Sequence, residues 1–151
     1  MPKTVIADSS CFIILFNIGE LELLTKVYGE VLTTAEVASE FAEPLPAWVK
    51  IKAATDKYRQ QILEIQLDKG ESSAIALALE TPGCTLILDD NKARKIATYL
   101  GIEITGTLGV IIKAKQKGIL PSVKPCLEKI KTTNFRLTDD LFQYALKEAG
   151  E

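Results

Sequence analysis

The sequence predicts an α/β fold in three layers, with a mostly parallel central sheet and helices on both of its faces. Residues 5–7 form a short apolar run, which is typical of a strand buried on both faces, as strands are in helix-covered parallel sheets. Further runs of this kind alternate with helical patterns, which indicates parallel strands joined by helical crossovers. The chain has 151 residues, a length that suits one core. We therefore expect residues 1–151 to form a single domain.

Strand-like runs and helical patterns alternate in the first part of the chain. Gly19 and Pro44 follow two of the helical patterns, at places where glycine and proline commonly end helices. Thr33 and Thr34 are both candidate caps of the second of these helices, and Glu36 fits a capping box if Thr33 is the cap. The predicted elements are a strand at 5–7, helices at 10–18 and from 20 onward, a strand at 29–32, and a helix that ends before Pro44.

Two stretches in the middle of the chain show a weaker pattern. Residues 43–55, which contain Trp48, are predicted to be a loop or irregular turn. Within the next stretch, residues 56–63 fit a helix and residues 64–67 alternate weakly, as a strand does.

Residues 84–88 are the clearest buried strand, and they are followed directly by Asp89 and Asp90. Pro82 and Gly83 separate this strand from a preceding helix. The predicted elements of this half are a helix over 74–80 opened by 69–73, the strand at 84–88, a helix at 91–100, a strand at 102–104, and helices at 108–117, 123–131 and 139–148.

Composition excludes several kinds of chemistry. The chain has no histidine, so serine-hydrolase triads and histidine acid–base catalysis are excluded. Its three cysteines are far apart and form no Cys-x-x-Cys motif, which argues against zinc and disulfides and for a reducing cytoplasm. No apolar run is long enough to span a membrane, and Asp8 interrupts the only apolar stretch that resembles a signal peptide. The net charge of −2 excludes a globally basic surface.

Acidic residues follow the predicted strands and helix starts. Asp8 ends the first strand, and Asp89 and Asp90 end the strand at 84–88. The carboxyl ends of parallel strands share one edge of the sheet, where ligand sites of such folds lie. Glu71 stands in the first turn of the helix that feeds the second of these strands, so it is placed at the same edge. Glu40 lies about two turns into its own helix, and its placement is weaker.

Convergent carboxylates suit a hard metal ion. Mg²⁺ and Mn²⁺ prefer oxygen ligands, and two ions ~4 Å apart activate a water and stabilise the leaving oxygen of a phosphodiester. The candidate metal ligands are Asp8, Glu71, Asp89 and Asp90, and Glu40 is a further candidate catalytic acid. Each also has a structural interpretation, because Asp8 and Asp90 suit helix caps, Glu71 suits a helix start, and Glu40 suits a solvated helix face.

Five short motifs run nearly end to end in an order and spacing that is fairly specific as a set. They are Asp8-Ser9-Ser10, Thr33 to Glu40, Gly70 to Ala78, Leu88-Asp89-Asp90 with Ala93-Arg94, and Thr105 to Val110. On these motifs the chain resembles PIN-domain proteins, in the DUF3368-like branch that is similar to the ribonuclease toxins of type II toxin–antitoxin systems.

The resemblance implies a PIN-like fold and a Mg²⁺- or Mn²⁺-dependent ribonuclease that acts on single-stranded RNA. Asp8, Glu40 and Glu71 fall on three of the family's acids, and the fourth is Asp89 or Asp90. It also implies a small antitoxin protein as partner and a homodimer. Two positions depart from the family's pattern, because many relatives have Asp where Glu71 stands and Thr or Ser where Leu88 stands.

Positive charge near the acids is needed to hold an RNA strand. Lys92 and Arg94 lie just beyond Asp89 and Asp90, and we take them as candidate nucleic-acid contacts together with Ser9 and Ser10. Lys95 belongs to the same basic group, whereas the lysines of the 108–117 helix are interpreted as a solvated face. Three tyrosines are candidates for base stacking, although packing is the favoured interpretation of each: Tyr58, Tyr99 and Tyr144.

Other classes fit the pattern less well. Phosphatases of the haloacid-dehalogenase type need a second Asp two residues after the first, where this chain has Ser10. Receiver domains need paired acids and a late Lys in an order that this chain does not follow. A catalytically weak or inactive PIN fold that binds nucleic acid or a protein partner is the main alternative, and the retained acids argue against it because clustered carboxylates are costly to a fold.

Overall fold

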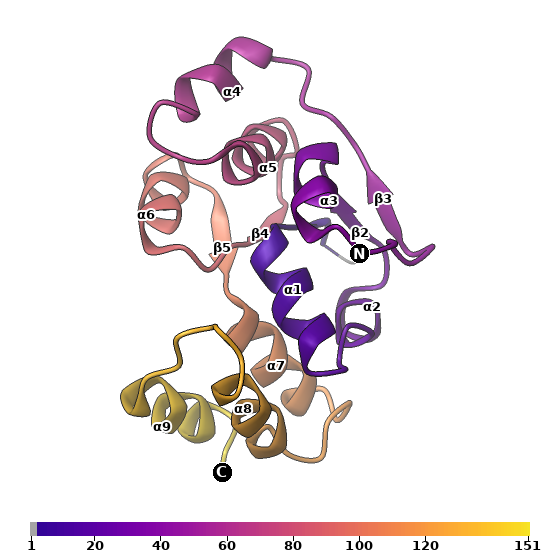
Figure 1. Ribbon diagram of the computed structural model, residues 1–151, viewed down its shortest axis with the longest axis vertical. Coiled ribbons are helices and arrows are strands. Elements are labelled where there is room, and N and C mark those ends of the chain that lie inside the picture. The colour runs from indigo at the N-terminus through magenta and orange to yellow at the C-terminus, as the bar shows by residue number, and fades with distance from the viewer. Residues whose placement is uncertain (1–2) are drawn as a thin grey trace.

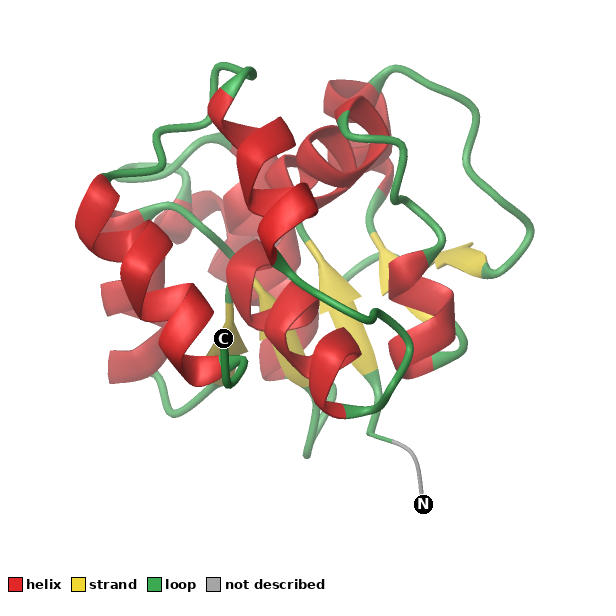
Figure 2. Cartoon of the chain, turned by 90° about the horizontal axis from the view of Figure 1, so that it is seen from below, coloured by secondary structure: helices red, strands yellow, loops and turns green. Residues whose placement is uncertain are grey.

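The computed structural model describes residues 3–151 and has a five-stranded sheet with helices on both faces (Figures 1 and 2). The strand order is β3-β2-β1-β4-β5, and every pairing of neighbours is parallel. This confirms the predicted three-layer α/β/α architecture. The strands are β1 Val5–Ala7, β2 Val31–Thr33, β3 Val49–Ile51, β4 Thr85–Ile87 and β5 Glu103–Thr105.

Helices connect the strands and extend beyond the last one. They are α1 Ser9–Asn17, α2 Leu23–Tyr28, α3 Ala35–Phe41, α4 Lys57–Leu63, α5 Lys69–Leu79, α6 Asn91–Tyr99, α7 Thr107–Gln116, α8 Lys124–Lys131 and α9 Asp139–Glu148. In Figure 1, α4 lies at one end of the molecule, and α7, α8 and α9 gather at the other. Helix α5 packs against β1 and β4, and α2 packs against β2 and α7.

The two central strands β1 and β4 are the most strongly apolar. The side chains of Val5, Ile6 and Ala7 have no exposed area, and the same holds for Leu86 and Ile87. Strands that are buried on both faces read as continuous apolar runs because each face packs against helices. The sequence signal was therefore strongest for the two strands that carry the centre of the sheet.

Three strands end at the same level of the sheet. Ala7 pairs with Ile87, and Ile87 pairs with Thr105. Just beyond these pairs, the amide of Asp8 donates to the carbonyl of Ile87 at 3.1 Å, so the chain leaves β1 while still attached to β4. The chain turns in opposite directions from β1 and β4, which makes the space between their carboxyl ends a topological switch point, where ligands bind in open parallel sheets.

The third strand corrects the sequence prediction. β3 occupies Val49–Ile51, inside the stretch predicted to be a loop, whereas residues 64–67 form a turn after α4 and not a strand. Only Val49 of the three β3 residues is buried. An edge strand with one buried side chain has almost no periodic signal, and its position is set by pairing with β2 instead.

Thr34, and not Thr33, caps α3. The Thr34 hydroxyl accepts from the amide of Val37 at 3.1 Å, whereas the Thr33 hydroxyl donates to the carbonyl of Ala7 at 2.8 Å and ties β2 to β1. Glu36 is therefore not a capping-box residue, and its carboxylate accepts from the side-chain amide of Gln60. Thr33 is still part of the strand, so its side chain points across the sheet instead of along the helix.

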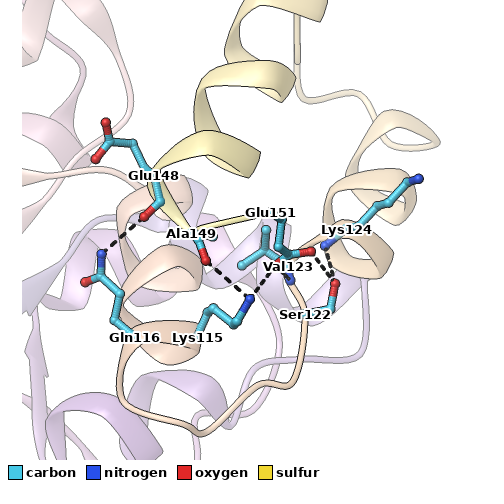
Figure 3. A network of polar contacts seen from close by, with 8 residues as sticks. All are labelled: Lys115, Gln116, Ser122, Val123, Lys124, Glu148, Ala149 and Glu151. Atoms are coloured by element: carbon cyan, nitrogen blue, oxygen red, sulfur yellow. Dashed lines mark hydrogen bonds and ion pairs between the residues drawn. The ribbon is translucent and has the colours of Figure 1, made fainter.

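A polar network closes the end of the molecule formed by α7 to α9 (Figure 3). Lys115 of α7 donates to the carbonyl of Ala149 at 3.2 Å and forms an ion pair with Glu151 at 3.0 Å. The Glu151 carboxylate also accepts from the Ser122 hydroxyl and from the Val123 amide. These bonds hold the turn after α9 against α7 and the start of α8. Among residues 3–151, no helix is long and apolar enough to cross a membrane.

Candidate active site

Asp8 lies at the carboxyl end of β1, and its carboxylate is buried without a full set of partners. The residue occupies the N-cap position of α1 with extended backbone angles, yet its side chain makes no capping hydrogen bond. It is 3% exposed, and Oδ1 has no hydrogen-bond partner among the described residues. The structural interpretation of Asp8 as a helix cap therefore fails, and an orphaned buried carboxylate oxygen stands in its place.

Burial and neighbouring acids make Asp8 a weaker acid than an exposed aspartate. Burial raises the pKa of Asp8 from 3.8 to about 7, which outweighs the lowering by the Ser9 amide. The carboxylates of Glu71, Glu40 and Asp68 raise this pKa further. A buried acid among other acids is destabilised in its charged form by lost hydration and by like charge. The cluster therefore favours any cation that neutralises it.

Glu71 and Asp68 form a capping box at the start of α5. The amide of Glu71 donates to Asp68 Oδ1 at 2.7 Å, and the amide of Asp68 donates to Glu71 Oε1 at 3.4 Å. Burial raises the pKa of Glu71 to about 7, with further contributions from Asp68 and Asp90. Asp68 is not among the acids predicted from the sequence, although Asp-x-x-Glu before an apolar helix is the signature of such a box.

Glu40 reaches the same group from α3. Burial and the charge of Asp68 raise the pKa of Glu40, whereas a hydrogen bond with the Ser9 side chain lowers it. The Glu40 carboxylate lies directly over Gly70, at a position that a Cβ at residue 70 would occupy. A hydrogen bond of 2.7 Å between the hydroxyls of Thr34 and Ser73 joins α3 to α5 beside this contact. Glycine at position 70 is thus what lets Glu40 approach the start of α5.

Asp89 is held in one orientation by three hydrogen bonds. Its Oδ2 accepts from the hydroxyls of Ser10 at 2.9 Å and Thr107 at 2.6 Å, and its Oδ1 accepts from the amide of Thr107 at 2.8 Å. A Cβ on Gly106 would lie 2.9 Å from Asp89 Oδ1, so glycine leaves room for the carboxylate. These hydroxyls come from α1 and α7. The side chain of Leu88, which stands before Asp89 where many relatives have Thr or Ser, offers no hydroxyl.

Asp90 and Arg94 have local roles in the structure. Asp90 is the N-cap of α6, and its carboxylate accepts from the amide of Ala93 at 2.9 Å. Arg94 donates from Nη1 to the carbonyl of Leu88 at 2.7 Å, so its guanidinium stays beside the carboxyl edge. Lys92 is exposed on the first turn of the same helix.

The predicted acids therefore gather at one edge of the sheet in two groups. Glu71, Glu40 and the unexpected Asp68 add to the rise in the pKa of Asp8 that burial causes, and Asp68 and Asp90 add to the rise at Glu71. Asp89 is held on the side of Ser10 and Thr107. As the side chains stand within residues 3–151, no three acids are close enough together to hold a metal ion.

Comparison with known proteins identifies the family of the chain. The DUF3368 family model, described as a PIN domain, matches residues 4–151. The chain belongs to the PIN-domain family. No curated protein and no solved structure matches it. PIN domains are generally nucleases and usually use divalent metals such as Mg²⁺.

The donor set of this PIN domain fits a hard divalent cation. Every candidate ligand is a carboxylate, and Mg²⁺ and Mn²⁺ prefer oxygen. The orphaned Oδ1 of Asp8 is an acceptor without a donor among the described residues, and burial, with the neighbouring carboxylates, raises the pKa values of Asp8 and Glu71. A bound cation would satisfy the oxygen and lower both pKa values.

Proposed function

We propose that this PIN domain is a Mg²⁺- or Mn²⁺-dependent endoribonuclease that cleaves single-stranded RNA, and that it is the toxin of a toxin–antitoxin pair. The observation that carries the proposal is the buried carboxylate of Asp8, whose Oδ1 has no partner among the described residues and which faces other acids at the switch point between β1 and β4. A purely structural aspartate at a helix start is expected to cap its helix, and Asp8 does not.

Within this proposal Asp8, Glu71 and Asp89 would hold the metal, with Glu40 as a further acid of the site. The bound metal supplies a Lewis acid for the phosphodiester and lowers the pKa of an attacking water. Ser10 and Thr107 orient Asp89 by hydrogen bonds, as partners behind metal ligands commonly do. Asp90 caps the first turn of α6, the helix that carries Arg94, and so helps to position that helix at the site.

Cleavage assays with and without metal test the proposal. We expect the protein to cut single-stranded RNA with Mg²⁺ or Mn²⁺ and to lose all cleavage in EDTA, because the chain has no histidine and the acids of the proposed site would act by holding the metal. Asp8→Asn and Glu71→Gln should lose cleavage by orders of magnitude. The exposed Glu128→Gln on α8 is the matched control and should cleave normally. Equal cleavage in EDTA, or none with either metal on diverse RNAs, contradicts the proposal.

A catalytically weak or inactive PIN fold is the second candidate. It is favoured by the local roles of Glu71 and Asp90, each of which is engaged in capping a helix. This candidate predicts binding of an RNA strand without cleavage under any metal condition. The assay above separates the two, since the active protein loses its RNA substrate over time and the inactive one does not.

The toxin role predicts a small partner protein encoded by a neighbouring gene. Co-expression of that partner should restore the growth that the PIN protein alone arrests. Rescue that also occurs with an unrelated small protein, or no growth arrest by an RNA-cleaving protein, would contradict the toxin role while leaving the nuclease intact.

A homodimer is proposed on the resemblance to PIN proteins. Light scattering should give twice the mass of 16.5 kDa at micromolar concentrations. A monomer mass across that range would reject the dimer.

A further inference from the structure

One face of α6 carries polar and aromatic residues from the carboxyl edge of the sheet to the opposite edge. These residues recur at spacings of three and four, which places them along one side of the helix. The opposite side, which includes Ala93 and Ala97, is buried. We call this side the α6 stripe, and its members are Asn91, Arg94, Lys95, Thr98 and Tyr99.

The α6 stripe lines a groove that begins at the candidate active site. A cavity of about 620 Å³ lies between the stripe and Ile104 of β5. A second cavity of about 360 Å³ shares Asn91, Arg94 and Ile104 with the first, and its lining includes Asp89 and Thr105. The two cavities therefore adjoin at these three residues, and their linings together reach from Asp89 at one end to Tyr99 at the other.

The chemistry of the groove changes along its length. Arg94 lies where the two cavities meet. Its guanidinium carries five N–H donors, and Nη1 donates to the Leu88 carbonyl. Lys95 is exposed beside it. Tyr99 was expected to pack in the core or on the surface, and its 89% exposure excludes the core. Two cations followed by an open aromatic ring match a phosphate backbone and a base.

We propose that this groove binds the RNA strand on one side of the scissile phosphodiester, with Arg94 and Lys95 on phosphates and Tyr99 stacked on a base. The proposal rests on the proposed nuclease function, which it extends by a path for the substrate. Eight residue steps along α6 span about 12 Å, which corresponds to roughly three stacked nucleotides. The groove thus holds nucleotides next to the cleavage site and not at it.

A second copy of the chain is the other occupant that this face would suit. The groove continues past Tyr99 into a more apolar cavity of about 330 Å³ lined by Ile62 and Leu63 of α4, and apolar surface is typical of protein interfaces. Two features favour RNA as the occupant. The cations Arg94 and Lys95 lie at the centre of the groove, and the groove adjoins Asp89 of the candidate active site.

Binding without cleavage tests the groove. A fluorescently labelled single-stranded RNA of about twelve nucleotides is titrated with the protein in EDTA, and anisotropy is measured over a range of salt concentrations. Tyr99→Ala should weaken binding by about fivefold to a hundredfold, the range for loss of one base stack, and Tyr99→Phe should restore it. Lys95→Gln should reduce the salt dependence by about 0.7 in the logarithmic slope, as one lost phosphate contact on a single strand does.

Matched controls keep the interpretation specific. Tyr58 of α4 is 81% exposed and lines none of the three cavities, so Tyr58→Ala should bind like the wild type. Lys129→Gln on α8 is the control for Lys95→Gln. Circular dichroism and sedimentation of each variant show whether the fold and the oligomeric state are unchanged.

The outcomes separate this proposal from the nuclease. Tyr99-dependent binding in a protein that cleaves nothing leaves the groove standing and removes the proposed activity. Metal-dependent cleavage with an unchanged KM in Tyr99→Ala removes the groove and leaves the activity. Unchanged RNA binding together with dissociation of a dimer in Tyr99→Ala overturns the proposal in favour of a contact between copies.

Discussion

Asp8 and Asp89 occupy similar places at the ends of neighbouring strands but have opposite surroundings. Asp8 is buried with an orphaned oxygen, whereas Asp89 accepts three hydrogen bonds. The sequence was sufficient to place both at the carboxyl edge, because a residue that directly follows a parallel strand lies at the edge where that strand ends. It was insufficient to give their partners, because Ser10 and Thr107 are 79 and 18 residues from Asp89 in the chain.

The hydrogen bonds also separate Asp89 from Asp90. A carboxylate has about four acceptor positions, and Asp89 uses three of them on groups that fix its orientation. Partners that fix a carboxylate in this way are typical of metal ligands. The Asp90 carboxylate accepts from the Ala93 amide as the cap of α6. We therefore assign the fourth acid of the site to Asp89 as a prediction.

Substitutions at these two positions test the assignment. Asp89→Asn should reduce cleavage at least a hundredfold, since it removes a charge from the site. Asp90→Asn should cleave within a few-fold of wild type, because Asn caps a helix as well as Asp. Asp90→Ala should lose about 1 kcal/mol of stability through the missing cap, which is roughly 2–4 °C in melting temperature. Loss of cleavage in Asp90→Asn with retention in Asp89→Asn would reverse the assignment.

At the scale of elements, the site depends on how closely α3 approaches the start of α5. Gly70 is buried in the first turn of α5 and lies against the Glu40 carboxylate. Glycine inside a helix is normally less favourable than alanine by about 1 kcal/mol. The position is therefore better explained by the space it leaves for Glu40 than by the helix itself.

Gly70→Ala tests this explanation. The new Cβ must displace the flexible end of Glu40, so cleavage should fall at least tenfold. Stability should be unchanged or slightly raised, because alanine favours the helix and Glu40 can rotate toward solvent. Melting curves and cleavage rates are measured for Gly70→Ala, Glu40→Ala and the double variant. Additive losses in the double variant would show that residue 70 acts independently of Glu40.

Helix α7 carries a charged face that also contacts other elements. Its lysines were expected to be solvated, and Lys113 and Lys117 are exposed, but each of the three also contacts another element. Lys113 lies over the ring of Tyr28 at 5.1 Å, Lys117 donates to the carbonyl of Val27 at 3.0 Å, and Lys115 joins the network of Figure 3. The hydrogen bond from Ser122, followed by those from Val123 and Lys115, lowers the pKa of Glu151 to about 2. Such contacts depend on α2 and α9, which the local pattern of α7 does not reveal.

For the whole molecule, the sequence predicted the layers and most elements because the topology follows from alternating strands and helices. The prediction from the sequence was wrong at β3, where pairing with β2 decides the structure. It was also wrong at residues 64–67, which alternate as a strand does but form a turn after α4. It also omitted Asp68, whose contribution depends on the folding of α5 beside Asp8. The error at β3 thus lies where contacts distant in sequence set the structure, whereas the turn at 64–67 and the capping box of Asp68 and Glu71 are local features.

The acid cluster makes the stability of the whole molecule depend on pH and metal. Burial raises the pKa of Asp8 from 3.8 to about 7 in the fold, so between these pH values the folded protein holds a proton that the unfolded chain releases. The contribution of Asp8 to stability is therefore fully present below about pH 4 and is lost as the pH rises through about 7. The loss from Asp8 is about 4 kcal/mol at most. Glu71 changes stability in the same direction, but it is half-exposed and contributes less.

We therefore expect the melting temperature of the metal-free protein to fall between pH 4 and pH 8. Asp8→Asn should remove most of this slope and should melt higher than wild type at pH 8, by roughly 2–4 °C for each kcal/mol recovered. Added Mg²⁺ should raise the melting temperature of the wild type by mass action, and that of Asp8→Asn less. Glu128→Gln is measured alongside as the control that keeps the wild-type behaviour. If Asp8→Asn keeps both the slope and the full Mg²⁺ effect, the Asp8 carboxylate is not part of a metal site.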